Sequence, residues 1–89
     1  MYKPPFTLII TISHAAGRGE LPWESVERRS FHTKADALDF ADLLWDDEDQ
    51  RRKKDARRLP ALSALRLEGP SGVLLEGSAL RSAARMQRD

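Results

Sequence analysis

The 89-residue chain contains no cysteine, so it can form neither a disulfide bond nor a zinc site built on thiolates. It also has no apolar run long enough to span a bilayer, and its N-terminal residues show no export segment. Nothing in the composition calls for an oxidising compartment or a membrane. We therefore expect a cytoplasmic protein.

Catalytic and metal-binding motifs are missing as well. The two histidines, His14 and His32, stand outside any pattern that would pair them with a nucleophile, and no set of three or four metal ligands is spaced to converge. Gly17-Arg18-Gly19 lacks the further glycine and the Lys-Ser/Thr pair of a phosphate-binding loop. The sequence thus predicts no enzyme activity, no metal and no cofactor.

The chain has almost no net charge, although a third of its residues are charged. Fifteen basic residues face 14 acidic ones, which gives a formal net charge of +1. The signs are nevertheless sorted along the chain, since acidic residues crowd the segment from Asp36 to Asp49 and basic ones the segment from Arg51 to Arg58. The local arrangement of charge is therefore more informative about a partner than the total.

The length allows one domain, residues 1–89, with a single core. From Phe6 to His14 a mostly apolar face alternates with a Thr-rich face, which predicts a strand covered on one side. A loop rich in glycine follows, and then a more polar extended run from Trp23 to Phe31. We interpret that run as an edge strand.

A long helix is predicted next. Thr33 can cap its first turn, Asp36 suits its positive end, and Pro60 ends it, so we expect a helix from Lys34 to Arg58. One side collects the residues expected in the core, with Phe40 and Leu43 widening it: Ala37, Leu38, Ala41, Leu44 and Trp45. Phe40 and Leu43 could instead form, with Trp23, an exposed patch for a partner. Beyond Trp45 the apolar pattern stops, and we expect that extension to be solvated.

The last part of the chain predicts a hairpin and a short helix. Alternation from Ala61 to Glu68, the turn Gly69-Pro70-Ser71-Gly72 and the run from Val73 to Glu76 indicate two paired strands. Leu80, Ala83 and Ala84 then mark one side of a terminal helix. The predicted fold is α+β: a four-stranded antiparallel sheet in the order ββαββ, with the long helix packed on one face and a possible short C-terminal helix.

The acidic side of the long helix is the leading candidate for a binding surface. Four aspartates fall about 5 to 6 Å apart along it and could occupy a basic surface of a partner protein: Asp39, Asp42, Asp46 and Asp49. A solvated outer face would give the same pattern, so both interpretations stay open. Calcium binding by the run from Asp46 to Asp49 is not expected, because helical residues point in different directions.

The basic end of the same helix supports an alternative, a nucleic-acid-binding accessory protein. Lysine and arginine gain affinity for nucleic acid by releasing counterions from phosphates. The residues concerned are Arg51, Arg52, Lys53, Lys54, Arg57 and Arg58. The neighbouring carboxylates oppose this interpretation, and pairs four residues apart along the helix explain the same charges structurally.

A resemblance bears on the choice between these hypotheses. The short chain, the helix opening from Thr33 to Ala41 after two strands, and the acidic helix face resemble small inhibitor proteins of phages and mobile elements, including some of the anti-CRISPR kind. The resemblance implies a non-enzymatic inhibitor that covers a basic nucleic-acid-binding surface of a host protein. A homodimer formed through polar edge strands is a further expectation.

Overall fold

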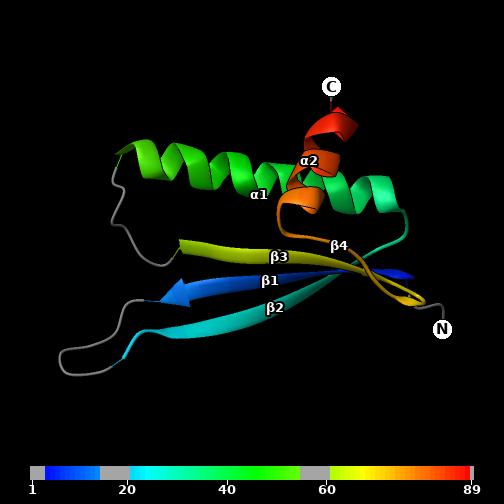
Figure 1. Cartoon of the computed structure of the whole chain (residues 1–89), viewed down its shortest axis with the longest axis horizontal. Helices are drawn as coiled ribbons and strands as arrows, with labels where there is room; N and C mark the ends of the chain where they lie inside the picture. Colours follow the sequence, from blue (N-terminus) through cyan, green and yellow to red (C-terminus); the bar gives the residue numbers. More distant parts are fainter. Residues whose placement is uncertain (1–3, 15–20, 55–60, 89) are drawn as a thin grey trace.

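The computed structural model describes residues 4–14, 21–54 and 61–88, and two helices lie there on one face of a four-stranded sheet (Figure 1). The strands are β1 (Phe6–His14), β2 (Trp23–Phe31), β3 (Ala61–Gly69) and β4 (Gly72–Glu76), and the helices are α1 (Lys34–Lys54) and α2 (Gly77–Arg88). The predicted α+β class, the antiparallel sheet and the two helices are confirmed. Predicted helical residues 55–58 lie outside the described residues.

The strand order is β2-β1-β3-β4, and every neighbouring pair is antiparallel. The chain therefore starts in the middle of the sheet, builds one edge with β2, crosses the face as α1, and completes the other side with the β3–β4 hairpin. The predicted turn closes that hairpin: Gly69 pairs with Gly72, whose φ of 124° is a backbone conformation that side chains other than glycine rarely adopt.

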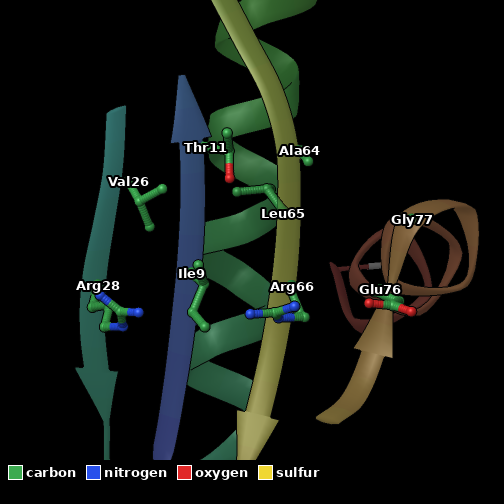
Figure 2. Close-up of a pocket in the computed structure, with 9 residues that line it drawn as sticks. All are labelled: Ile9, Thr11, Val26, Arg28, Ala64, Leu65, Arg66, Glu76 and Gly77. Atoms are coloured by element: carbon green, nitrogen blue, oxygen red, sulfur yellow. The ribbon is translucent and has the colours of Figure 1, made fainter. Parts of the chain in front are cut away.

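The sheet face away from the helices carries a cross-strand row of long side chains. Ile9 of β1 pairs with Arg28 of β2 and with Arg66 of β3, and Figure 2 shows the two arginines on either side of it. Although neither α1 nor α2 covers this face, Ile9 is only 5% exposed. Arg28 and Arg66 line one hollow together with Ile9, and long arginine side chains can cover neighbouring apolar groups while their charged ends stay in water.

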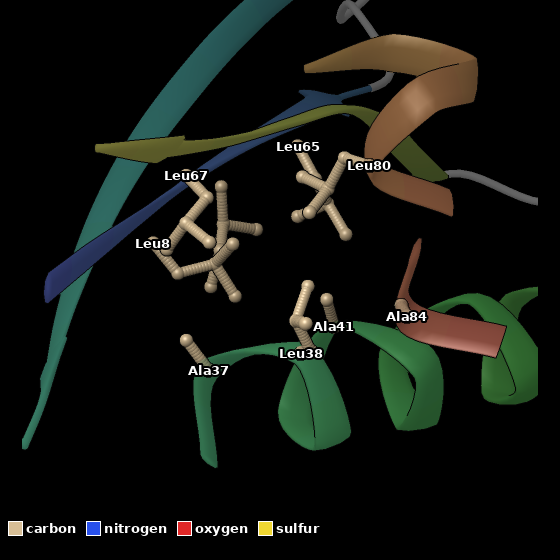
Figure 3. Close-up of a cluster of buried hydrophobic side chains, with 9 residues drawn as sticks. Leu8, Ala37, Leu38, Ala41, Leu65, Leu67, Leu80 and Ala84 are labelled. Carbon is tan, nitrogen blue, oxygen red and sulfur yellow. The ribbon is translucent and has the colours of Figure 1, made fainter. Parts of the chain in front are cut away.

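The core lies between the sheet and the two helices (Figure 3). Alternate residues of β1 and β3 point toward the helices, which is the one-sided sheet that the alternation predicts. The core's largest fully buried side chains are those of Leu8, Leu67 and Leu80, and α2 adds Ala84 beside α1. The remaining buried members are Ile10, Ala37, Leu38, Ala41 and Leu65.

The start of α1 follows from its sequence. The Thr33 side-chain oxygen accepts a hydrogen bond of 3.1 Å from the backbone N–H of Asp36, which satisfies one of the unpaired donors of the first turn. Ala37, Leu38 and Ala41 then face the core, as predicted. Leu43 does not, since its side chain is 53% exposed, so the predicted widening of the apolar side is wrong at this residue.

The far half of α1 is also less solvated than its sequence suggests. Glu48 is only 8% exposed, and its Oε2 accepts a hydrogen bond of 3.2 Å from the backbone N–H of Leu62 at the start of β3. Its Oε1 lies 3.3 Å from Nε of Arg52, one of the ion pairs expected at a spacing of four residues. A buried carboxylate thus joins the helix to the sheet where the apolar pattern has ended.

Candidate partner-binding surfaces

The predicted stripe of aspartates divides into two groups. Asp39 and Asp46 are exposed and point away from the core, with the exposed Leu43 between them. These three residues follow each other at spacings of four and three, so they share one side of the helix. We call them the outer face of α1; Gln50, one turn further, donates a hydrogen bond of 3.4 Å to Asp46.

Asp42 and Asp49 lie seven residues apart on the flank of α1 that faces α2, and both are half-buried. Asp49 accepts a hydrogen bond of 2.7 Å from Nη2 of Arg81, and the Arg81 guanidinium also lies 5.8 Å from the ring centre of Trp45. Asp49 therefore holds the two helices together within the chain. Because the Asp49 carboxylate already binds Arg81, we do not count Asp49 among the carboxylates that a partner would contact.

The basic residues predicted for the nucleic-acid alternative are dispersed. Arg52 pairs with Glu48, whereas Lys53 and Lys54 are exposed at the end of α1. Arg85 of α2 joins these two lysines around an open depression of about 640 Å³, but Asp46, Asp49 and Gln50 line it too. The predicted Arg57 and Arg58 lie outside the described residues. The described part of this surface thus carries both signs of charge.

A smaller groove of about 160 Å³ lies between α1 and the helix-facing side of β1, β2 and β3. Its floor is apolar and includes Ile10, Phe40 and Leu44. Charged groups of both signs line its rim, and the guanidinium of Arg29 lies 5.2 Å from the ring centre of Phe40. Glu27 and Arg29 of this groove are exposed on β2, so the groove adjoins the exposed surface of that strand.

The two histidines occupy different surroundings. His14 Nε2 shares a hydrogen bond of 2.7 Å with Ser25 Oγ, and its ring stacks on Trp23 with centroids 4.0 Å apart and planes 10° from parallel. An imidazole beside a hydroxyl is one half of a nucleophilic site, but no carboxylate among the described residues bonds the other ring nitrogen. His32 is exposed before α1.

Among residues 4–14, 21–54 and 61–88, no three histidine, aspartate or glutamate residues gather as a metal site would require. Within the same residues, neither helix combines the length and the apolar character needed to cross a membrane. No protein-family model, no curated protein and no solved structure matches this chain.

Sequence reasoning missed the stacking of His14 on Trp23, the burial of Glu48 and the engagement of Asp49. Pairing of β1 with β2 brings His14 opposite Trp23, which the two predicted strands and their connecting loop would have indicated. Engagement of Asp49 depends instead on where α2 packs, and α2 lies more than 20 residues further along the chain. The sequence located the acidic helix but did not show which of its carboxylates are free to meet a partner.

Proposed function

We propose that this protein is a non-enzymatic protein-binding module that docks the outer face of α1 on a basic surface of its partner. The observation that carries the proposal is the exposed Leu43 between two exposed carboxylates, Asp39 and Asp46. An apolar side chain at the centre of a contact, ringed by charged groups, is the common anatomy of a protein interface.

The two kinds of residue would contribute differently to binding. Burial of Leu43 against a partner would supply hydrophobic free energy, about 1.5 to 3 kcal/mol for a fully buried leucine. Asp39 and Asp46 would mainly accelerate the encounter with a basic surface and exclude acidic ones. Because α1 is attached to the rest of the chain through Glu48 and Asp49, the helix would bind with little loss of conformational entropy.

The partner that fits best is a protein that itself binds nucleic acid. Two exposed carboxylates two helical turns apart, Asp39 and Asp46, can take the place of phosphates in an arginine-rich groove, so the module would compete with the nucleic acid for that groove. Such competition is what the resemblance to anti-CRISPR inhibitors of phages and mobile elements implies. We place this activity in the cytoplasm, where a chain without cysteine is unaffected by reducing conditions.

Quantitative capture from a cell lysate tests the proposal. The immobilised protein is compared with D39N/L43A/D46N, which alters the outer face of α1, and with E68Q/E76Q, which removes the same two negative charges from β3 and β4. Loss of a captured protein with the first variant and its retention with the second supports the proposal. Equal capture by all three proteins would contradict it, provided that circular dichroism shows each to be folded.

The nucleic-acid alternative predicts the opposite effect of removing the charges of Asp39 and Asp46, namely stronger binding. If Lys53, Lys54 and Arg85 bound phosphates, the isolated protein would be retained on DNA or RNA at low salt and released steeply as salt rises. Glutamine at the three positions would abolish that retention, and D39N/D46N would strengthen it by removing repulsion. Absence of retention at low salt would dispose of the alternative and leave the protein-binding proposal.

A further inference from the structure

β2 forms an open edge of the sheet. It pairs with β1 along one side only, and Figure 1 shows no described element beyond its other side. Nine residues of edge strand leave a row of backbone N–H and C=O groups available to a further strand. Large apolar side chains are exposed here as well: Leu21 at 88%, Trp23 at 54% and Val26 at 52%.

From this edge we propose that two copies of the chain pair through β2, antiparallel, with a two-fold axis at Val26. The strands of both copies would form one continuous sheet. Such a pairing is isologous, since each copy offers the same surface to the other. The proposal is independent of the proposed function, because β2 and the outer face of α1 belong to different parts of the molecule.

The order of residues along β2 makes this register complementary to itself. With Val26 opposite its counterpart, Glu24 of each copy lies opposite Arg28 of the other, which gives two pairs of opposite charge on the open face of the sheet. On the helix side, Trp23 of each copy lies opposite Arg29 of the other. Aromatic and guanidinium groups at that separation attract each other.

Neighbouring registers are less favourable. Residues directly opposite each other in an antiparallel pair point to the same face of the sheet. The two-fold axis must therefore pass through a residue and its counterpart. Moving the axis by one residue shifts the partner of every other residue by two positions. An axis at Glu27 sets that carboxylate against its own copy. An axis at Arg29 sets two guanidinium groups against each other, and an axis at Arg28 does the same although it also places Glu27 opposite Arg29. An axis at Ser25 leaves no oppositely charged pair.

Two side chains of the proposed contact are already held in place within one copy. Trp23 stacks against His14, whose centroid is 4.0 Å away, and the Arg29 guanidinium lies 5.2 Å from the ring centre of Phe40. Each would therefore lose little freedom when the second copy arrives. Their exposed surfaces point to the same side of the sheet, where the partner's β2 would carry the complementary group.

Mixing of two charge variants tests both the dimer and its register. Sedimentation should show that the wild-type chain self-associates, and that E24R and R28E each weaken association by about tenfold or more, because two favourable pairs become two unfavourable ones. An equimolar mixture of E24R with R28E should dimerise again, since positions 24 and 28 then carry opposite charges across the new pair. A wild-type chain that stays monomeric at the concentrations used for NMR, or a mixture that does not associate, would overturn the proposal.

Oxidative cross-linking gives a second, independent readout. The chain has no cysteine, so V26C introduces a single thiol at the proposed axis. Opposed Cα atoms about 4.5 to 5.5 Å apart are within disulfide range, so V26C should form a covalent dimer readily. E27C is the matched control, because its thiols would lie diagonally and too far apart. Cross-linking of E27C in preference to V26C would refute this register. If sedimentation shows that the wild-type chain is monomeric, the β2 edge would instead be expected to pair with a strand of another protein.

Discussion

The two halves of α1 are attached to the sheet by different physical means. The first half buries Ala37, Leu38 and Ala41 against the leucines of β1 and β3. The second half has few apolar contacts and depends on Glu48, which bonds the backbone of Leu62, and on Asp49, which bonds Arg81. Burial of apolar surface is non-directional, whereas these polar contacts fix position and angle. Hydrogen bonds made by the terminal groups of polar side chains can therefore hold a helix in place where its hydrophobic pattern has ended.

The largest effect is expected in the first half. Leu38→Ala should lower the free energy of unfolding by about 2 to 5 kcal/mol, because it removes buried methyl groups and leaves a cavity between α1 and the sheet. Urea denaturation of the variant beside wild type measures the change. A loss well below that range would mean that this half relies less on burial than its packing shows.

Glu48→Ala should come next, at about 1 to 3 kcal/mol, since it leaves the Leu62 N–H without its acceptor at a partly buried site. Asp47→Ala is the matched control, because the neighbouring Asp47 is exposed on the same turn of the same helix. The same denaturation experiment applies. Equal effects of the two substitutions would show that burial of Glu48 contributes nothing.

Arg81→Ala should have a smaller effect, no more than about 1 kcal/mol. Its ion pair with Asp49 is 2.7 Å long, but both side chains are more than 40% exposed, and water weakens such pairs. Part of the loss should persist at high salt, because the contact with Trp45 goes too. A loss that disappears completely in high salt would assign the effect to charge alone.

The smallest effect belongs to the outer face of α1. Leu43→Ala and Asp39→Asn should each change the free energy of unfolding by about 0.5 kcal/mol or less, since neither side chain packs on the core. Thermal and urea unfolding check this. Clear destabilisation by either variant would show that the face serves the fold, and the proposed contact surface would lose its basis.

Local patterns explain which features were predictable. Alternation in Phe6–His14 and the capping Thr33 act within a few residues, so the strand and the helix start could be derived from the sequence. The glycines of the β3–β4 turn likewise predict its hairpin. The acidic side of α1 was located for the same reason, because helical spacing is a local property.

Long-range contacts explain what was not predictable. Glu48 accepts a hydrogen bond from the backbone of Leu62, 14 residues away, and Asp49 accepts one from Arg81, 32 residues away. Neither partner can be identified before β3 and α2 are placed. For Leu43 the sequence left both the core and an exposed patch open, because a helical pattern shows the direction of the apolar side but not its width. That width is set by the elements packed on either flank.

Hydrogen exchange along α1 tests most directly whether the helix is attached at two separate places. In wild type, amide protection should extend through both halves. In Glu48→Ala, protection should fall sharply after Trp45 and stay close to wild type around Ala37 and Ala41. Unchanged protection after Trp45, or an equal loss in both halves, would contradict the separate attachment of the second half.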